Sequence, residues 1–96
     1  MNKYENIIIM IPDITDKNKK EIKKDYKTIL NNELEFEELG IKKLAYEITR
    51  NNKKYKEGSY MVTRFKGTGA DVQSLEAYIR TNENIIKFIT IRNEEI

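Results

Sequence analysis

The chain has 96 residues, of which 35% are charged, a formal net charge of +2, and neither cysteine nor histidine. This length predicts one domain over residues 1–96, because a second hydrophobic core has no room. The missing residue types exclude disulfides, thiolate nucleophiles, histidine-based catalysis and the usual zinc sites. No apolar run approaches the roughly 20 residues of a membrane-spanning helix, and the start of the chain lacks the layout of a secretory signal. We therefore expect a cytoplasmic protein.

Residues 3–11 are predicted to form a central strand, because they are rich in isoleucine and end at Pro12, which cannot continue a ladder. Both faces of this strand are apolar, which is typical of a strand covered on both sides. A helix follows, capped by Thr15 or Asp16 and ending near residues 31–32. Its apolar residues at helical spacing are Ile22, Tyr26, Ile29 and Leu30.

Six lysines crowd the polar side of this helix, at positions 17, 19, 20, 23, 24 and 27. Such a cluster could bind nucleic acid, or it could simply keep a helix surface hydrated. We favour the hydrated surface, because no aromatic residue is interleaved and Glu21 and Asp25 dilute the charge.

Residues 34–48 alternate apolar and polar side chains, but the phase slips at 37–38 and again at 42–43. Because successive side chains of a strand point to opposite faces, an uninterrupted strand cannot bury all of these apolar residues on one side. Bulges or a bend are therefore expected. Lys42 and Lys43 could then point outward toward a partner, or they could merely keep an edge strand soluble.

A polar loop too long for a tight turn is predicted over residues 49–57, and a strand over 58–65. Arg64 would be costly in a core, so Tyr60 and Val62, which share its parity, should lie with it on the open side. The alternate residues, which should face the helices, are Met61, Thr63 and Phe65.

Thr68 with Asp71 three positions later is a capping-box signal for a second helix. Its apolar stripe consists of Val72, Leu75, Tyr78 and Ile79. The nearby glycines do not fit the phosphate-binding loop motifs. A turn at 82–84, a last strand over 85–92 and a polar tail over 93–96 complete the chain.

The order strand, helix, strand, strand, helix, strand predicts an α+β, ferredoxin-like split βαβ fold, with a four-stranded antiparallel sheet and both helices on one face. The other sheet face is then left open. The residues expected to form an apolar patch there are Ile7, Ile9, Tyr60, Val62 and Ile89. Such a patch favours a protein partner.

Catalysis and metal or cofactor binding are not expected, because the glutamates at 33, 35, 37 and 38 resemble the wet side of a strand rather than a desolvated pair. Nucleic-acid binding is better supported, because cations and tyrosines gather on the predicted hairpin. The cations are Lys42, Lys43, Arg50, Lys53, Lys54, Lys56 and Arg64, and the tyrosines are Tyr46, Tyr55 and Tyr60. Residues 58–62 lack the aromatic signature of the RNA-recognition motif, so backbone contacts with structured RNA are favoured.

Four segments in the right order resemble the family of the sixth protein of the bacterial small ribosomal subunit. They are NKYE at 2–5, LGIKKLAYEI at 39–48, the strand start at 58–60, and RTNENIIKFITIR at 80–92. The resemblance implies a non-enzymatic structural protein that pairs with small-subunit protein eighteen and binds the central domain of 16S ribosomal RNA. The rival is a small-molecule-binding regulatory domain of the same fold that dimerises through its sheet, with residues 67–69 as its one candidate ligand loop.

The resemblance also assigns roles to residues. Those carried over to the RNA side are Lys3, Tyr4, Lys42, Lys43 and Arg92, with Lys87 where the family often has arginine. The residues expected to meet the protein partner are Tyr46, Ile48, Tyr60, Val62 and Ile89. Two departures stand out: Glu47 replaces a usual proline, and lysine replaces arginine at 42 and 43, which loses the planar fork for phosphate.

Overall fold

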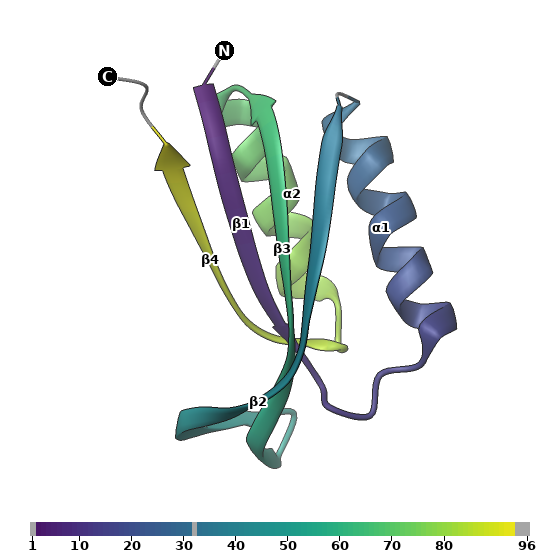
Figure 1. Ribbon diagram of the computed structural model, residues 1–96, viewed down its shortest axis with the longest axis vertical. Coiled ribbons are helices and arrows are strands. Elements are labelled where there is room, and N and C mark those ends of the chain that lie inside the picture. Colours follow the sequence, from purple (N-terminus) through teal and green to yellow (C-terminus); the bar gives the residue numbers. More distant parts are fainter. Residues whose placement is uncertain (1, 32, 94–96) are drawn as a thin grey trace.

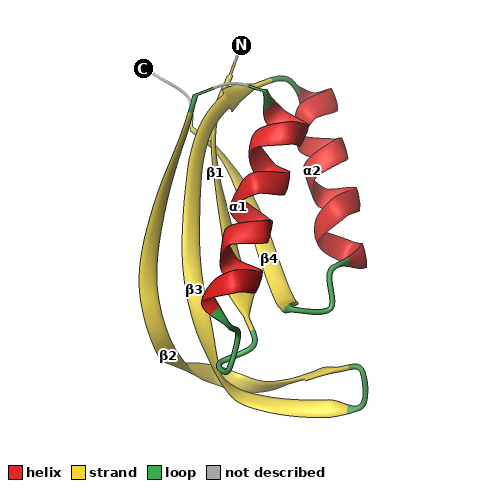
Figure 2. Cartoon of the chain, turned by 90° about the vertical axis from the view of Figure 1, so that its right-hand side faces the viewer, coloured by secondary structure: helices red, strands yellow, loops and turns green. Residues whose placement is uncertain are grey.

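The computed structural model describes residues 2–31 and 33–93, and within them the strands and helices follow the predicted order (Figure 1). The elements are β1 (Asn2–Met10), α1 (Asp16–Leu30), β2 (Leu34–Arg50), β3 (Lys53–Gly67), α2 (Gly69–Thr81) and β4 (Ile85–Asn93). The strands pair antiparallel in the order β2-β3-β1-β4, and both helices cover the same face of the sheet (Figure 2). The ferredoxin-like split βαβ fold is therefore confirmed. Asn32, near the predicted helix end, and the predicted tail at 94–96 lie outside the described residues.

The sheet has one covered and one open face, as the parity of β3 predicts. Ile8 pairs with Met61, and both are fully buried beneath the helices. Ile7 pairs with Val62 on the other face, where no helix packs. The prediction that β1 is covered on both sides is wrong, because its second apolar face lies on the open side of the sheet.

Both helices begin at the predicted caps. The Thr15 side-chain oxygen accepts a hydrogen bond from the Asn18 backbone N–H at 3.2 Å. At α2, the Thr68 hydroxyl accepts from the Asp71 N–H at 3.3 Å, and the Asp71 carboxylate accepts from the Thr68 N–H at 2.9 Å. These bonds satisfy orphan donors at the helix starts, so local sequence fixes where each helix begins.

A buried hydrogen-bond chain crosses the core between α1, β1 and β4. The Tyr26 hydroxyl donates to Asn6 Oδ1 at 2.6 Å, and Asn6 Nδ2 donates to Thr90 Oγ1 at 3.1 Å. Burial raises the pKa of Tyr26. Buried polar groups are stable only when paired, so this chain fixes how α1 sits on the sheet.

The β2–β3 hairpin is longer than predicted, and the predicted loop over 49–57 is wrong. Arg50 pairs directly with Lys53, leaving only Asn51 and Asn52 as the turn. Their φ angles of 52° and 65° are left-handed, as a two-residue type I′ turn requires and as asparagine tolerates. The irregularities predicted from the phase slips are confirmed, because the register shifts between Glu38 and Gly40 and again between residues 43 and 48.

The far part of this hairpin, residues 41–58, is called the distal hairpin here. It bends away from the sheet and turns toward the side of the helices (Figures 1 and 2). At its root Gly58 lies so close to β1 that a Cβ would overlap Ile9 Cγ2 and lie 3.2 Å from the Met10 carbonyl oxygen. At its tip Arg50 Nη2 donates to the Arg80 carbonyl at 3.0 Å, which ties the hairpin to the end of α2.

Candidate nucleic-acid and protein interfaces

The distal hairpin carries five exposed lysines. They are Lys42, Lys43, Lys53, Lys54 and Lys56. Glu47, which replaces the proline usual at this position in the family that the sequence resembles, lies 3.8 Å from the Lys56 ammonium, and 81% of the Lys56 side chain stays exposed. Such an exposed pair is worth at most about 1 kcal/mol. The arm therefore presents a water-accessible cationic surface.

Aromatic side chains accompany these lysines. Tyr46 is 85% exposed, so its ring faces water. The Lys42 ammonium lies 5.9 Å from the centre of the Tyr60 ring, a cation–π contact. Because Tyr60 pairs with Ile9 in the sheet, this contact joins the root of the distal hairpin to the open sheet face.

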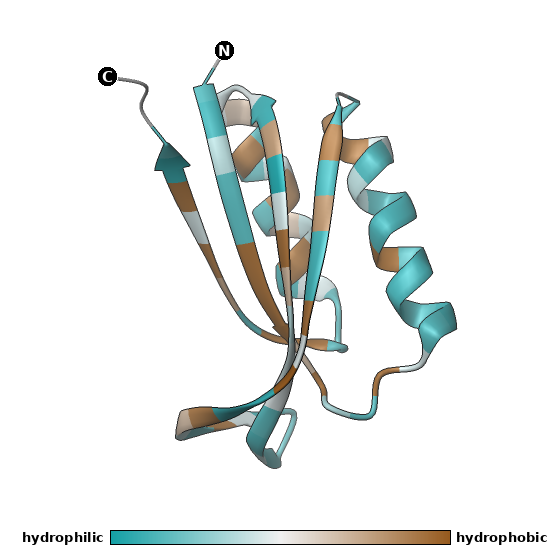
Figure 3. Cartoon of the chain, viewed as in Figure 1, coloured by the Kyte–Doolittle hydropathy of each residue, from teal (hydrophilic) through white to brown (hydrophobic). Residues whose placement is uncertain are grey.

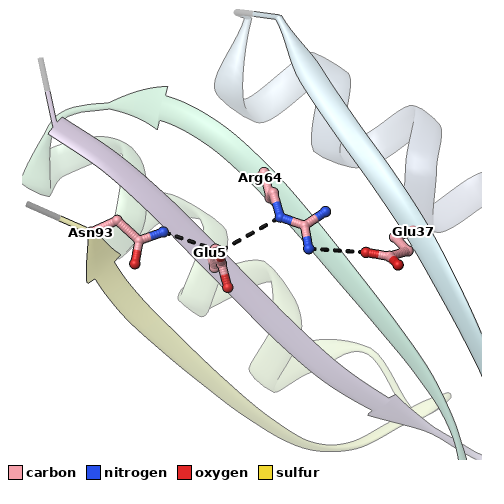
Figure 4. Close-up of polar contacts among 4 residues, drawn as sticks. All are labelled: Glu5, Glu37, Arg64 and Asn93. Atoms are coloured by element: carbon pink, nitrogen blue, oxygen red, sulfur yellow. Dashed lines mark hydrogen bonds and ion pairs between the residues drawn. The ribbon is translucent and has the colours of Figure 1, made fainter. Parts of the chain in front are cut away.

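Two of the predicted RNA-binding arginines make contacts within the protein. Arg64 lies between Glu5, at 3.5 Å, and Glu37, at 2.9 Å, on the open face (Figure 4). Asn93 Nδ2 donates to Glu5 at 3.1 Å, so the polar contacts run across all four strands. The hydrogen bond to Glu37 is the main cause that raises the pKa of the Arg64 guanidinium. Arg50 contacts α2, and its Nε is buried with no partner among the described residues.

The remaining predicted RNA residues lie elsewhere. Tyr4 is only 8% exposed and stacks on Phe65 with ring centres 5.5 Å apart, so its ring packs in the core. Lys3 and Arg92 lie on paired strands β1 and β4 at the end of the molecule opposite the distal hairpin. Lys87 lines a surface hollow together with Arg50, near the tip of the distal hairpin. Apart from Arg64, the predicted cations thus form two groups, at opposite ends of the longest axis of the molecule, which extends 37 Å.

Figure 3 shows brown, apolar segments along β1, β3 and β4, and strand pairing brings the predicted patch residues together on the open face. Ile7 pairs with both Val62 and Ile89 across three adjacent strands. Ile89 is 54% exposed, whereas Val62 is nearly covered by its neighbours and contributes little exposed surface to the patch. Ile91, which shares the parity of Ile89 and is 41% exposed, was missed although the period of two pointed to it.

The other predicted partner residues lie on the distal hairpin. Tyr46 lies within the second register shift of β2, and Ile48, which pairs with Tyr55, is the first residue beyond it. Leu39 and Ile41, at the root of this arm, are also exposed and were missed. Their exposure follows from the bulge at Gly40, whose φ of 81° breaks the alternation that a sequence pattern can follow.

Other chemistries find no support in the described part of the chain. Nowhere in residues 2–31 and 33–93 do three acidic side chains gather as a metal site requires. No described helix is long and apolar enough to cross a membrane. Glu38, one of the four clustered glutamates, is engaged by Lys19 at 3.3 Å and Lys23 at 3.2 Å.

Known proteins resemble this chain over nearly its whole length. A family model described as ribosomal protein S6 matches residues 3–92. The small ribosomal subunit protein bS6 of Gloeobacter violaceus is 34% identical, over 97% of this chain and 97% of that protein. The bS6 protein of Desulfosudis oleivorans is 36% identical over 95% of this chain, which spans 54% of that longer relative.

A solved structure agrees with the fold. The crystal structure of 30S ribosomal protein S6 from Thermotoga maritima superposes with a TM-score of 0.80 and 30% sequence identity, covering 96% of this chain and 87% of that one. The predicted family, its non-enzymatic structural class and its ribosomal, cytoplasmic location are thereby confirmed. The chain belongs to the ribosomal protein S6 family of the small ribosomal subunit.

Proposed function

We propose that this chain binds 16S ribosomal RNA through the distal hairpin and docks small-subunit protein eighteen on its open sheet face. One observation carries the proposal: five exposed lysines share one projecting arm, whereas Arg64 is paired with the carboxylates of Glu5 and Glu37. Ammonium groups on an arm that extends beyond the core can reach phosphates without disturbing the fold. The contacts are expected to position the protein on RNA rather than to read bases.

The modest charge explains why a protein partner is needed. With a net charge of +2, the whole-molecule field gives little long-range attraction to RNA. The exposed patch around Ile89 can be buried by a partner, which adds apolar contact area and its own cations. We therefore expect the preformed pair to bind RNA more tightly than either protein alone.

The rival function, a regulatory domain that binds a small molecule at residues 67–69, is disfavoured by the local geometry. The Thr68 backbone N–H already donates to the Asp71 carboxylate at 2.9 Å. A Cβ at Gly67 would lie 2.8 Å from the same carboxylate. The loop is thus filled by a negatively charged cap, which suits a helix start and repels an anionic ligand.

The test is charge reversal at the root of the distal hairpin. Lys42→Glu combined with Lys43→Glu should abolish association with the central-domain RNA and leave thermal stability nearly unchanged, because both side chains are exposed. The matched control is Lys42→Arg with Lys43→Arg, which preserves the charge and should bind at least as well. Binding is measured with and without protein eighteen.

Salt dependence separates phosphate contacts from other effects. The logarithm of RNA affinity falls as the logarithm of the salt concentration rises. If both lysines contact phosphates, this dependence should become shallower by about 0.7 to 0.9 in slope for each contact that the variant loses. Charge-reversed protein that binds RNA like the parent would refute the assignment of the arm. If that variant unfolds, the lysine pair is structural instead. If the protein is instead a small-molecule-binding regulatory domain, the unaltered protein should bind no RNA.

A further inference from the structure

A second basic surface lies on helix α1, apart from the distal hairpin. Four of its lysines recur at intervals of three, four and three residues, which places them along one side of a helix. They are Lys17, Lys20, Lys24 and Lys27, called the lysine stripe here, and all are exposed. The buried side of the helix carries Ile22, Tyr26 and Leu30. The stripe is therefore an outward face and has no part in the core.

α1 carries three acidic residues, of which Asp16 lies at the start of the helix, four residues before Lys20 and therefore beside the stripe. Asp25 accepts a hydrogen bond from the Tyr78 hydroxyl of α2 at 2.7 Å. Glu21 is close enough to Tyr78 to help raise its pKa. Asp25 thus faces α2, whereas Glu21 is exposed and lies beside Lys17 and Lys24, so the acids border the stripe and do not interrupt it.

On the flank of α1 that faces β2, two further lysines pair with a glutamate, and neither belongs to the stripe. Lys19 and Lys23 both contact Glu38 of β2. Among the described residues, none of the four stripe lysines makes an ion pair. Their charge is therefore available to an external anion.

The shape of the stripe fits a repeated anion. At 1.5 Å of rise per residue, the four positions are separated by about 4.5 to 6 Å and span about 15 Å along the axis. The surface between them is hollowed, with a lining of Lys20, Lys23, Lys24, Lys27 and Thr28. One small anion would meet only part of this length, whereas the phosphates of a polynucleotide strand can follow it.

A membrane surface is a poorer fit. A helix that lies on a bilayer inserts an apolar face into the lipid, but the apolar face of α1 is buried against the sheet. The large exposed apolar residues of the described chain are all on β2 and β4, none on α1. Hydrated cations without an apolar anchor favour a nucleic-acid backbone.

We propose that the lysine stripe of α1 is a second contact for the RNA backbone. The identity of the ligand rests on the proposed function. Because the distal hairpin turns toward the side of the sheet that carries the helices (Figure 2), the stripe and the hairpin lysines can meet one folded RNA. The open face on the other side stays available to the protein partner. The stripe has no interleaved aromatic residue, so it holds phosphates and reads no bases.

The test replaces all four stripe lysines by glutamine, which has similar helix propensity and no charge. The variant Lys17→Gln, Lys20→Gln, Lys24→Gln, Lys27→Gln should bind the central-domain RNA, in the presence of protein eighteen, about tenfold or more weakly at 100 mM salt. Its salt slope should be shallower by up to about 3. The matched control with arginine at the same four positions should bind like the parent. Circular dichroism and thermal unfolding verify that both fold.

The outcomes separate this inference from the proposed function. If the glutamine variant keeps the parent affinity and salt slope while the Lys42→Glu, Lys43→Glu variant loses binding, the stripe inference falls and the proposed function stands. If the unaltered protein binds no RNA, both fall. Loss of binding to vesicles of phosphatidylcholine with phosphatidylserine, with RNA affinity unchanged, would assign the stripe to a membrane and overturn the inference.

Discussion

The body of the molecule and its distal hairpin share the strands β2 and β3 but are held together by different forces. In the body, Ile8 and Met61 are 0% exposed beneath the helices, so hydrophobic burial fixes the strand register. In the distal hairpin, Ile41 and Tyr46 are 57% and 85% exposed, so backbone pairing and the two-residue turn hold the arm. One region therefore provides the stability of the fold, and the other leaves its side chains free for contact.

The largest expected effect comes from truncating one isoleucine in each region and comparing the loss in the free energy of unfolding. Ile8→Ala should lower the free energy of unfolding by about 2–5 kcal/mol, because it opens a cavity in the core. Ile41→Ala should change it by no more than about 0.5 kcal/mol, because the side chain already faces water. Urea denaturation monitored by circular dichroism measures both. Equal losses would show that the side chains of the distal hairpin belong to the cooperative core, and that stability does not come from the body alone.

Much of the body could be predicted from the sequence, because its signals are local and periodic. The capping residues Thr15 and Thr68 lie within three positions of the backbone N–H groups they serve. The helix stripes repeat at 3.6 residues and the strands at two, which fixes the faces of β3 and the open-face patch. The phase slips in β2 also mark its irregular points, since a bulge displaces the alternation where it occurs.

The distal hairpin and several site residues could not be predicted, because their roles depend on distant partners. Asn51 and Asn52 adopt left-handed φ angles, which asparagine tolerates but does not require. The sequence alone therefore does not distinguish this two-residue turn from a longer polar loop. Arg64 meets Glu5 and Glu37 only after three strands have paired. The family resemblance places Tyr4 on the RNA side, yet its ring stacks on Phe65 in the core.

A second test addresses the junction between the two regions. Gly58→Ala should lower stability by about 1–3 kcal/mol, because the added methyl would overlap Ile9 Cγ2 and crowd the Met10 carbonyl oxygen, so that neighbouring atoms must shift. The matched control is Gly69→Ala, where a Cβ meets nothing within 4 Å and stability should be unchanged or rise by up to about 1 kcal/mol. Thermal unfolding of both variants measures the difference. A neutral Gly58→Ala would show that the distal hairpin can shift without disturbing the body.

The smallest expected effect is at Glu38, where β2 leaves the body just before its first register shift. The hydrogen bond from Lys23 is the main cause that lowers the pKa of this carboxyl. A lowered folded-state pKa means that the contribution of Glu38 to stability is present above the ordinary carboxyl pKa of about 4.3 and is lost as the pH falls below it. The side chain is 44% exposed, so screening by water keeps the contribution small.

Glu38→Gln should therefore lower the free energy of unfolding at pH 7 by about 0.2–1 kcal/mol, and the difference from the parent should shrink below pH 4 and in 1 M salt. Glu83→Gln, at an exposed position in the turn before β4, controls for the loss of one negative charge. If Glu38→Gln lowered the free energy of unfolding by well above 1 kcal/mol even in 1 M salt, the ion pairs of Glu38 with Lys19 and Lys23 would fix the position of the root of the distal hairpin. The hairpin would then depend on α1 for its position, and stability and contact would no longer be separate properties of the two regions.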